Sequence, residues 1–179
     1  MRIITPELFQ KLLDASAIRS RIKREVRFAT AVAAMQDDDW TTTELIAIGD
    51  RSGNKGVLIL EDDEANLYPA GYEISRGMTS SSGKAQPIIC DFCRTWQTGS
   101  RSGSVTIHKP GRDTGSISFL CCADLQCSRH VRNLTEASKT SRAQMREDMD
   151  NEHRIARLQR RIKEITTVLG IEPINSRDL

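Results

Sequence analysis

The stretch FLCCADLQCSRH, from Phe119 to His130, contains three of the five cysteines of this chain. The other two, Cys90 and Cys93, lie upstream in IICDFC. An odd number of cysteines argues against a disulfide framework, and clustered cysteines in a reducing compartment indicate a metal site or catalysis. If four thiolates bind one metal ion, one of the five cysteines is spare.

The first pair of candidate ligands has the spacing C-x-x-C. A tight turn between Cys90 and Cys93 can direct both thiolates at one ion, and zinc prefers four nitrogen or sulfur ligands at tetrahedral angles. The second pair is either Cys121 with Cys127 or Cys122 with Cys127.

Alternation along SISFLC distinguishes these two choices. Ile117, Phe119 and Cys121 share one face of a predicted strand, and this apolar face is expected to meet the core. Cys122 then ends the strand, next to a helical turn that begins near Cys127. The sequence therefore predicts zinc bound by Cys90, Cys93, Cys122 and Cys127, with Cys121 as the spare thiol.

These elements follow one another in the order of a treble clef. A knuckle comes first, then hairpin strands at about 104–108 and 115–121, then a helix from about 123 to 137 that carries the last ligand. Four cysteines form a closed, structural site, whereas a catalytic zinc has three protein ligands and an open position. His130, three residues after Cys127, is a minor alternative as a ligand.

Rival chemistries find less support. A redox C-x-x-C needs a thioredoxin-like βαβ context, which the sequence lacks. A nucleophilic cysteine needs a histidine partner, and His108, His130 and His153 show no local catalytic signature. We therefore expect no enzymatic activity, and a zinc enzyme is the least favoured class.

The rest of the chain predicts helices around a small antiparallel unit. Thr5-Pro6-Glu7 is typical of a helix start, and apolar spacing continues it as one helix or two over about 6–28. The turn-rich DRSGNKG separates two apolar runs, which predicts a hairpin of 45–49 with 57–61. A further helix is predicted over 147–170, where apolar residues recur at steps of three and four.

The fold class expected from these elements is α+β. The predicted regions are residues 1–78 with the N-terminal helix and β-hairpin, 79–87 as a Ser/Gly-rich linker, 88–142 as the treble-clef zinc finger, and 143–179 with the terminal helix.

Charge is distributed unevenly, although the net charge is only +2. Residues 1–30 and 90–142 are basic, and the segment between them begins with an acidic stretch. The arginines and lysine of 19–27 are interpreted as a solvated helix face, in preference to a nucleic-acid surface. No apolar run is long enough to cross a membrane, and no secretory signal is recognisable, so we expect a cytoplasmic protein without a membrane partner.

CDFC followed by FLCCADLQCSRHVR resembles the C-terminal treble-clef zinc finger of the elongation-factor-G-binding protein family. This family includes the bacterial fusidic-acid-resistance proteins. The match runs through Cys122-Ala123-Asp124-Leu125-Gln126-Cys127-Ser128 and closes at Val131-Arg132, so that the cysteine before Ala-Asp-Leu is the ligand. AMQDDDWTTTELIAIGDRSGNKGVLIL and HRIARLQRRIKEI are also similar to segments of the family.

The resemblance implies a protein that binds elongation factor G and modulates its release from, or action on, the ribosome, as in fusidic acid resistance. A treble clef exposes its knuckle and the outer face of its helix. The residues expected there, as a partner-binding surface, are Asp91, Phe92, Arg94, Arg129 and Arg132.

A second class of function remains open, in which the zinc finger binds RNA or DNA directly. Its support is a basic set around the finger: Arg94, Arg101, Lys109, Arg112, Arg129, Arg132, Lys139 and Arg142. Few aromatic residues lie between these cations, which weakens base stacking as a mode of binding.

Overall fold

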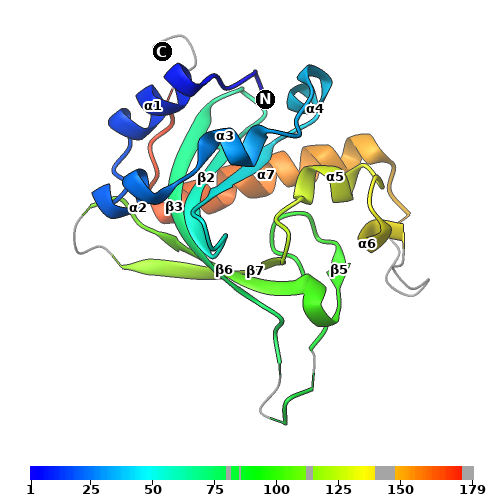
Figure 1. Cartoon of the computed structure of the whole chain (residues 1–179). Coiled ribbons are helices and arrows are strands. Elements are labelled where there is room, and N and C mark those ends of the chain that lie inside the picture. Colours follow the sequence, from blue (N-terminus) through cyan, green and yellow to red (C-terminus); the bar gives the residue numbers. More distant parts are fainter. Residues whose placement is uncertain (80–81, 85, 112–114, 140–147, 175–179) are drawn as a thin grey trace.

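The computed structural model describes residues 1–79, 82–84, 86–111, 115–139 and 148–174. Within these ranges the centre of the fold is a five-stranded antiparallel sheet with the order β1-β2-β3-β6-β7 (Figure 1). Its strands are β1 (Leu45–Gly49), β2 (Lys55–Glu61), β3 (Leu67–Arg76), β6 (Ser102–His108) and β7 (Ser116–Cys122). A smaller sheet pairs β4 (Ile88–Ile89) with β5 (Trp96–Gln97). The predicted α+β class is confirmed.

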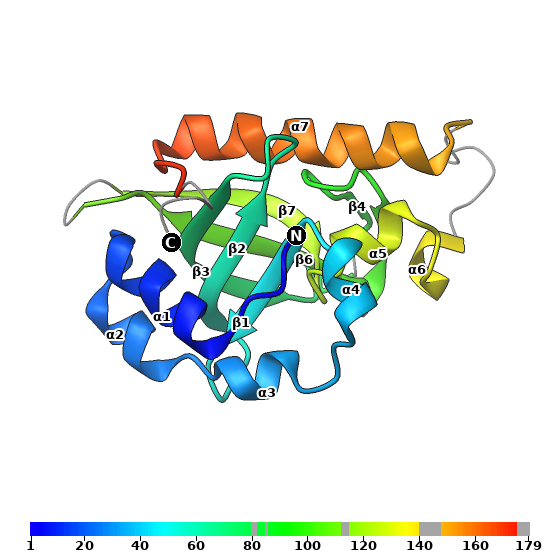
Figure 2. The ribbon, with the colours of Figure 1, turned by 90° about the horizontal axis from the view of Figure 1, so that it is seen from above.

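Helices lie on both faces of the large sheet. Figure 2 shows α7 along one face and the N-terminal helices along the other. The helices are α1 (Pro6–Ala15), α2 (Ser20–Glu25), α3 (Phe28–Val32), α4 (Asp37–Thr41), α5 (Cys127–Val131), α6 (Glu136–Lys139) and α7 (Asn151–Leu169), with a 3₁₀ turn, η1 (Gly99–Arg101). None of the helices in the described ranges is long and apolar enough to cross a membrane.

Strand β2 separates two hydrophobic cores, because successive side chains of a strand point to opposite faces. Leu58 and Leu60 belong to the core under α7, which also contains the cysteines of the finger. Val57 and Ile59 belong to the core under the N-terminal helices. The predicted hairpin is confirmed, with Leu45 opposite Leu60 and Gly49 opposite Gly56.

The N-terminal helical region contains two short helices within 6–28, which is one of the two predicted alternatives. Its start is as expected, because the Thr5 hydroxyl accepts a hydrogen bond from Leu8 N at 3.2 Å and Pro6 opens the helix. Helix α1 ends at Ala15, because the backbone of Ser16 is extended. The Lys23 ammonium donates to the carbonyl oxygens of Leu13 and Ser16 and so satisfies groups left open at the helix end.

Strand β3 was not predicted, and it joins the two halves of the chain. It pairs with β2 along Lys55–Glu61 and with β6 from Tyr72 to Arg76. One sheet therefore runs across the predicted linker at 79–87. The division into regions stays a prediction, and residues 80–81, 85 and the boundary at 142–143 lie outside the described residues.

The predicted finger helix over 123–137 is too long. Leu125 has a φ of 54° and Asn133 a φ of 57°, and residues in this left-handed region cannot continue a right-handed helix. Helix α5 therefore begins at Cys127 and ends at Val131, and the single turn of α6 follows from Glu136.

The terminal helix has clear signals at both ends. The Asp150 carboxylate accepts a hydrogen bond from His153 N at 2.9 Å, and Gly170 ends the helix with a φ of 67°. Helix α7 thus starts at Asn151, and residue 147 of the prediction lies outside the described residues. Leu158, Ile162 and Ile165 are buried against the sheet, as the apolar spacing predicts.

Candidate metal centre

The first half of the site is a tight turn after β4. Cys90 N donates to Thr95 O at 3.1 Å, and Arg94 N donates to Cys90 O at 3.0 Å. Arg94 adopts a φ of 59°, which lets the chain reverse and enter β5. The two short strands thereby bring Cys90 and Cys93 to one side of the turn, as the C-x-x-C spacing predicts.

The second half comes from the end of β7 and the start of α5. Cys122 is the last residue of β7 and Cys127 the first of α5. Between them the chain turns through Leu125, whose N–H donates to Cys122 O at 3.0 Å. This turn places the two sulfurs beside each other, although four residues lie between them in sequence.

The four cysteine sulfurs meet in one buried cluster. The sulfurs of Cys90, Cys93, Cys122 and Cys127 all lie within 4.8 Å of one another. The Cys90–Cys127 distance is 3.8 Å and the Cys93–Cys122 distance is 3.5 Å. Four sulfurs at about 2.3 Å from a tetrahedral ion stand about 3.8 Å apart, so these two distances are close to those of a tetrahedral metal site.

The thiols of the cluster also shift one another's pKa values. Burial opposes ionisation of Cys90, but hydrogen bonds from Cys122, Cys127 and Cys93 outweigh it and lower the pKa of this thiol well below its usual value. The pKa of Cys127 is raised well above the usual value, first by its hydrogen bonding with Cys122 and then with Cys90. Thiols must lose their protons to bind a metal ion, and a bound cation favours their ionised form.

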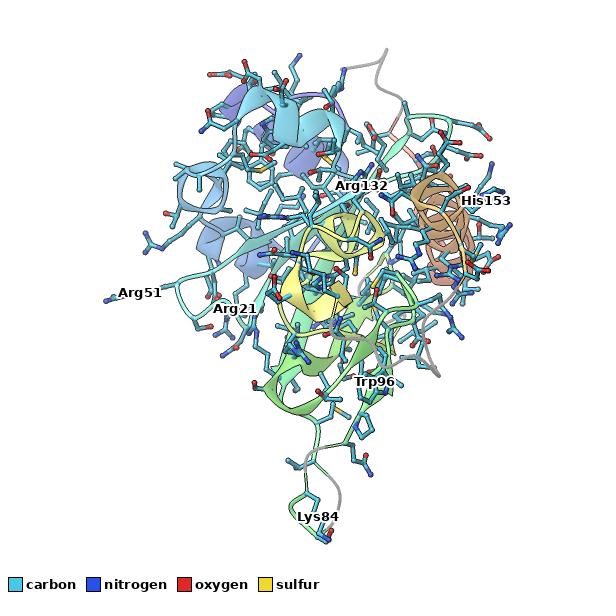
Figure 3. The ribbon with its side chains drawn as sticks, turned by 90° about the vertical axis from the view of Figure 1, so that its right-hand side faces the viewer. Arg21, Arg51, Lys84, Trp96, Arg132 and His153 are labelled. Carbon is cyan, nitrogen blue, oxygen red and sulfur yellow. The ribbon has the colours of Figure 1, made fainter. Side chains whose placement is uncertain are left out.

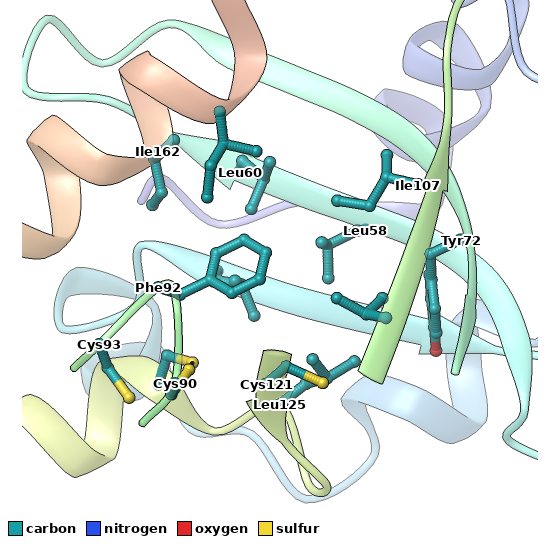
Figure 4. Packing of buried hydrophobic residues seen from close by; sticks show 14 of the residues in the cluster. Leu58, Leu60, Tyr72, Cys90, Phe92, Cys93, Ile107, Cys121, Leu125 and Ile162 are labelled. Carbon is teal, nitrogen blue, oxygen red and sulfur yellow. Dashed lines mark hydrogen bonds between the residues drawn. The ribbon is translucent and has the colours of Figure 1, made fainter. Parts of the chain in front are cut away.

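Cys121 stands apart from this cluster, as the alternation predicts. It is fully buried in the core under α7, and burial raises the pKa of its thiol. Figure 4 shows its sulfur pointing away from Cys90 and Cys93. The side chain therefore behaves as a small apolar residue.

His130 is not needed as a ligand. Its Nδ1 lies 2.6 Å from Thr135 Oγ1, and its Nε2 lies 3.1 Å from Asp124 Oδ1. Although Cys122, Asp124 and His130 also lie within 4.8 Å of one another, both ring nitrogens already have partners. The ring thus joins the turn before α5 to the chain after it.

Two further groups close the site and were missed from the sequence. The Gln97 amide donates to Cys122 Sγ at 3.4 Å, and the Gln97 side chain is buried. Arg161 Nε donates to the knuckle carbonyl of Asp91 at 3.1 Å. The C-x-x-C spacing does not reveal either contact, because one comes from β5 and the other from the distant helix α7.

Two of the five predicted partner residues have structural roles instead. Phe92 was expected on the surface, and this is wrong: its ring is fully buried, and Figure 4 shows it pointing into the core. It packs edge-on against Phe119, with ring centroids 6.0 Å apart. Arg132 is largely buried by its ion pair with Glu44. The turn directs Phe92 inward because the core under α7 lies directly behind the knuckle.

The other three predicted residues remain open to a partner. Arg94 and Arg129 are exposed, and Asp91 is half-buried. Asp91 Oδ2 accepts a hydrogen bond from Leu120 N at 2.7 Å, which ties the knuckle to β7. Arg112 and Arg142 of the predicted basic set lie outside the described residues.

Comparison with known proteins gives one match. A family model described as the FBP C-terminal treble-clef zinc-finger matches residues 16–168. Neither the curated proteins nor the solved structures contain a match to the chain. The matched range includes all four clustered cysteines and most of helix α7.

Proposed function

The chain belongs to the family of the FBP C-terminal treble-clef zinc finger, and on this premise we propose that it is a zinc-stabilised binding module for elongation factor G. The observation that carries the proposal is the buried cluster of four cysteine sulfurs at tetrahedral spacing. The module acts by binding and catalyses no reaction.

Zinc is the metal that suits this donor set. Four thiolates in a tetrahedral arrangement are typical of structural zinc sites, and they leave no position open for a water or substrate. Cys90, Cys93, Cys122 and Cys127 would hold the ion, which supplies folding energy when bound. The Gln97 amide would orient Cys122 through its N–H···S contact.

The metal would fasten the finger to the sheet. Cys127 begins α5, and the next residue, Ser128, accepts hydrogen bonds from Glu44 N at 2.8 Å and Leu45 N at 3.3 Å. Glu44 N and Leu45 N lie at the start of β1. Fixing Cys127 in the metal site therefore also fixes the edge of the sheet that the N-terminal half contributes.

The partner is proposed from the resemblance of CDFC and FLCCADLQCSRHVR to the elongation-factor-G-binding proteins. A protein of this kind changes the release of elongation factor G from the ribosome, or its action there, by binding one state of the factor more tightly than another. Resistance to fusidic acid would be one consequence of such binding.

The surface beside the knuckle supports a protein partner. Ile89 and Leu120 are 37% and 38% exposed, and the hydrogen bond from Asp91 N to Leu120 O at 2.8 Å holds their strands together. Arg94 is exposed beside them, and Arg129 is exposed on α5. Apolar side chains flanked by arginines are a composition found at protein interfaces.

Calorimetric titration tests this proposal. Purified elongation factor G is titrated into the zinc-loaded chain, into Arg129→Glu, and into Arg160→Glu as the matched control on α7. We expect Arg129→Glu to weaken binding at least tenfold and the control to bind like the wild type. Unchanged affinity in Arg129→Glu would show that this surface does not bind elongation factor G. No binding by the wild type would exclude elongation factor G as the partner.

A further inference from the structure

A second charged surface lies where α2 meets the turn between β1 and β2. An open hollow there is lined by four cationic side chains, one apolar residue and two carboxylates: Arg24, Arg27, Arg51, Lys55, Val26, Glu25 and Asp50. The sequence alone favours a solvated helix face for 19–27. The structure adds Arg51 and Lys55, which come from a distant turn.

The hollow keeps free positive charge after its internal pairs are counted. Glu25 binds Lys55 at 2.5 Å and Arg21 at 3.1 Å, and these hydrogen bonds, first that from Lys55, lower the pKa of its carboxyl. Asp50 accepts hydrogen bonds from the hydroxyl of Ser52 at 2.8 Å and from its N–H at 3.1 Å. The side chains of Arg24, Arg27 and Arg51 are exposed, so their guanidinium groups face solvent around the hollow.

Hydrogen bonds hold the backbone segments that carry these arginines. Arg27 N donates to Gly49 O at 2.9 Å, which joins the end of α2 to the end of β1. Arg76 donates to Gly53 O and to Asn54 Oδ1, each at 2.8 Å, and so holds the turn that carries Arg51. Figure 3 shows Arg21 and Arg51 on one side of the molecule and His153 of α7 on the other.

We propose that this hollow binds the phosphate backbone of RNA through Arg24, Arg27 and Arg51. Guanidinium groups bind phosphate oxygens in a bidentate manner, and backbone binding needs no apolar anchor. A protein partner would need such an anchor at the centre of its interface, and only Val26 is apolar here. The choice of RNA over DNA rests on the proposed function, because the ribosome presents RNA phosphates.

The test uses the zinc-loaded chain and a fluorescein-labelled RNA duplex of about 20 base pairs, measured by anisotropy at several salt concentrations. Three phosphate contacts predict that raising salt from about 50 to about 200 mM weakens binding about 20- to 40-fold. Arg51→Gln is expected to weaken binding and to lower the salt slope by about one. Arg160→Gln, an equal charge change at an exposed position on α7, is expected to bind like the wild type.

The triple variant Arg24→Gln/Arg27→Gln/Arg51→Gln is expected to lose RNA binding while it keeps the wild-type urea midpoint. No RNA binding by the wild type at low salt would overturn the proposal, as would equal losses in Arg51→Gln and Arg160→Gln. Tighter binding to a DNA duplex of the same sequence or to polyglutamate would also overturn it. Because elongation factor G is absent from this assay, its outcome is independent of the calorimetric titration.

Discussion

The guanidinium of Arg132 forms paired hydrogen bonds with the carboxylate of Glu44, at 2.5 and 2.9 Å, across 88 residues of sequence. Arg132 also donates to Ser128 O at 2.9 Å and thus closes the end of α5. Glu44 is only 4% exposed, and Arg132 pairs with its buried carboxylate. The pair joins the finger to β1, and it explains why Arg132 does not belong to an open partner surface.

Removing Arg132 should therefore destabilise the fold. Arg132→Ala leaves the Glu44 carboxylate buried without its cation, which costs about 3 kcal/mol. Urea unfolding measures the effect, and Arg129→Ala, which truncates an exposed arginine on α5, should change the free energy of unfolding by less than about 0.5 kcal/mol. Equal effects of the two substitutions would show that the ion pair does not hold the finger to the sheet.

Phe92→Ala should act through the core. The substitution leaves a cavity beside Phe119 and is expected to lower the free energy of unfolding by about 3–5 kcal/mol. Leu134→Ala is the control, because Leu134 is 57% exposed and its truncation should leave stability nearly unchanged. Full stability of Phe92→Ala, combined with weaker binding of elongation factor G, would restore the surface role that the sequence suggested.

Part of this fold was readable from the sequence. The spacing of Cys90 and Cys93 and the alternation that ends at Cys121 identified the four cysteines that cluster, because both are local rules. Ligand spacing needs only a turn, and alternation needs only one strand. The same locality explains why the start at Pro6 and the hairpin from Leu45 were found.

Other features depend on contacts that a single segment does not contain. Strand β3 was missed, although Tyr68, Ala70, Tyr72 and Ile74 alternate and all face the core under α7. Pro69 lies opposite Ile59 of β2, but β6 pairs with β3 only from Tyr72 to Arg76, so the proline lies where the other edge of β3 is not paired with β6. The direction of the Phe92 ring likewise depends on the sheet behind the knuckle.

Asp62, which lies outside the metal centre, should make the free energy of unfolding fall as the pH becomes acidic. Burial alone would raise the pKa of Asp62, but hydrogen bonds from Tyr68 Oη at 2.8 Å and from Asn66 N at 3.0 Å outweigh it and lower this pKa. A lowered folded-state pKa contributes stability above the unfolded pKa, and this contribution is lost as pH falls through the folded value.

Asp62→Asn should accordingly be less stable than the wild type at neutral pH, because the amide cannot accept these hydrogen bonds as strongly. The difference should shrink below about pH 4, where the unfolded carboxyl takes up its proton. Urea midpoints of both proteins against pH measure it. A difference that stays constant from neutral pH to acid would contradict the assigned role of the carboxylate.

Elemental analysis of the purified chain and of two serine variants tests the central claim most directly. The wild type and Cys121→Ser should each contain one zinc ion per chain, because Cys121 lies outside the cluster of four sulfurs. Cys122→Ser should lose the zinc or retain it in a small fraction of the molecules, since it removes one of four thiolates. Zinc retained by Cys122→Ser and lost from Cys121→Ser would contradict the assignment of the metal centre.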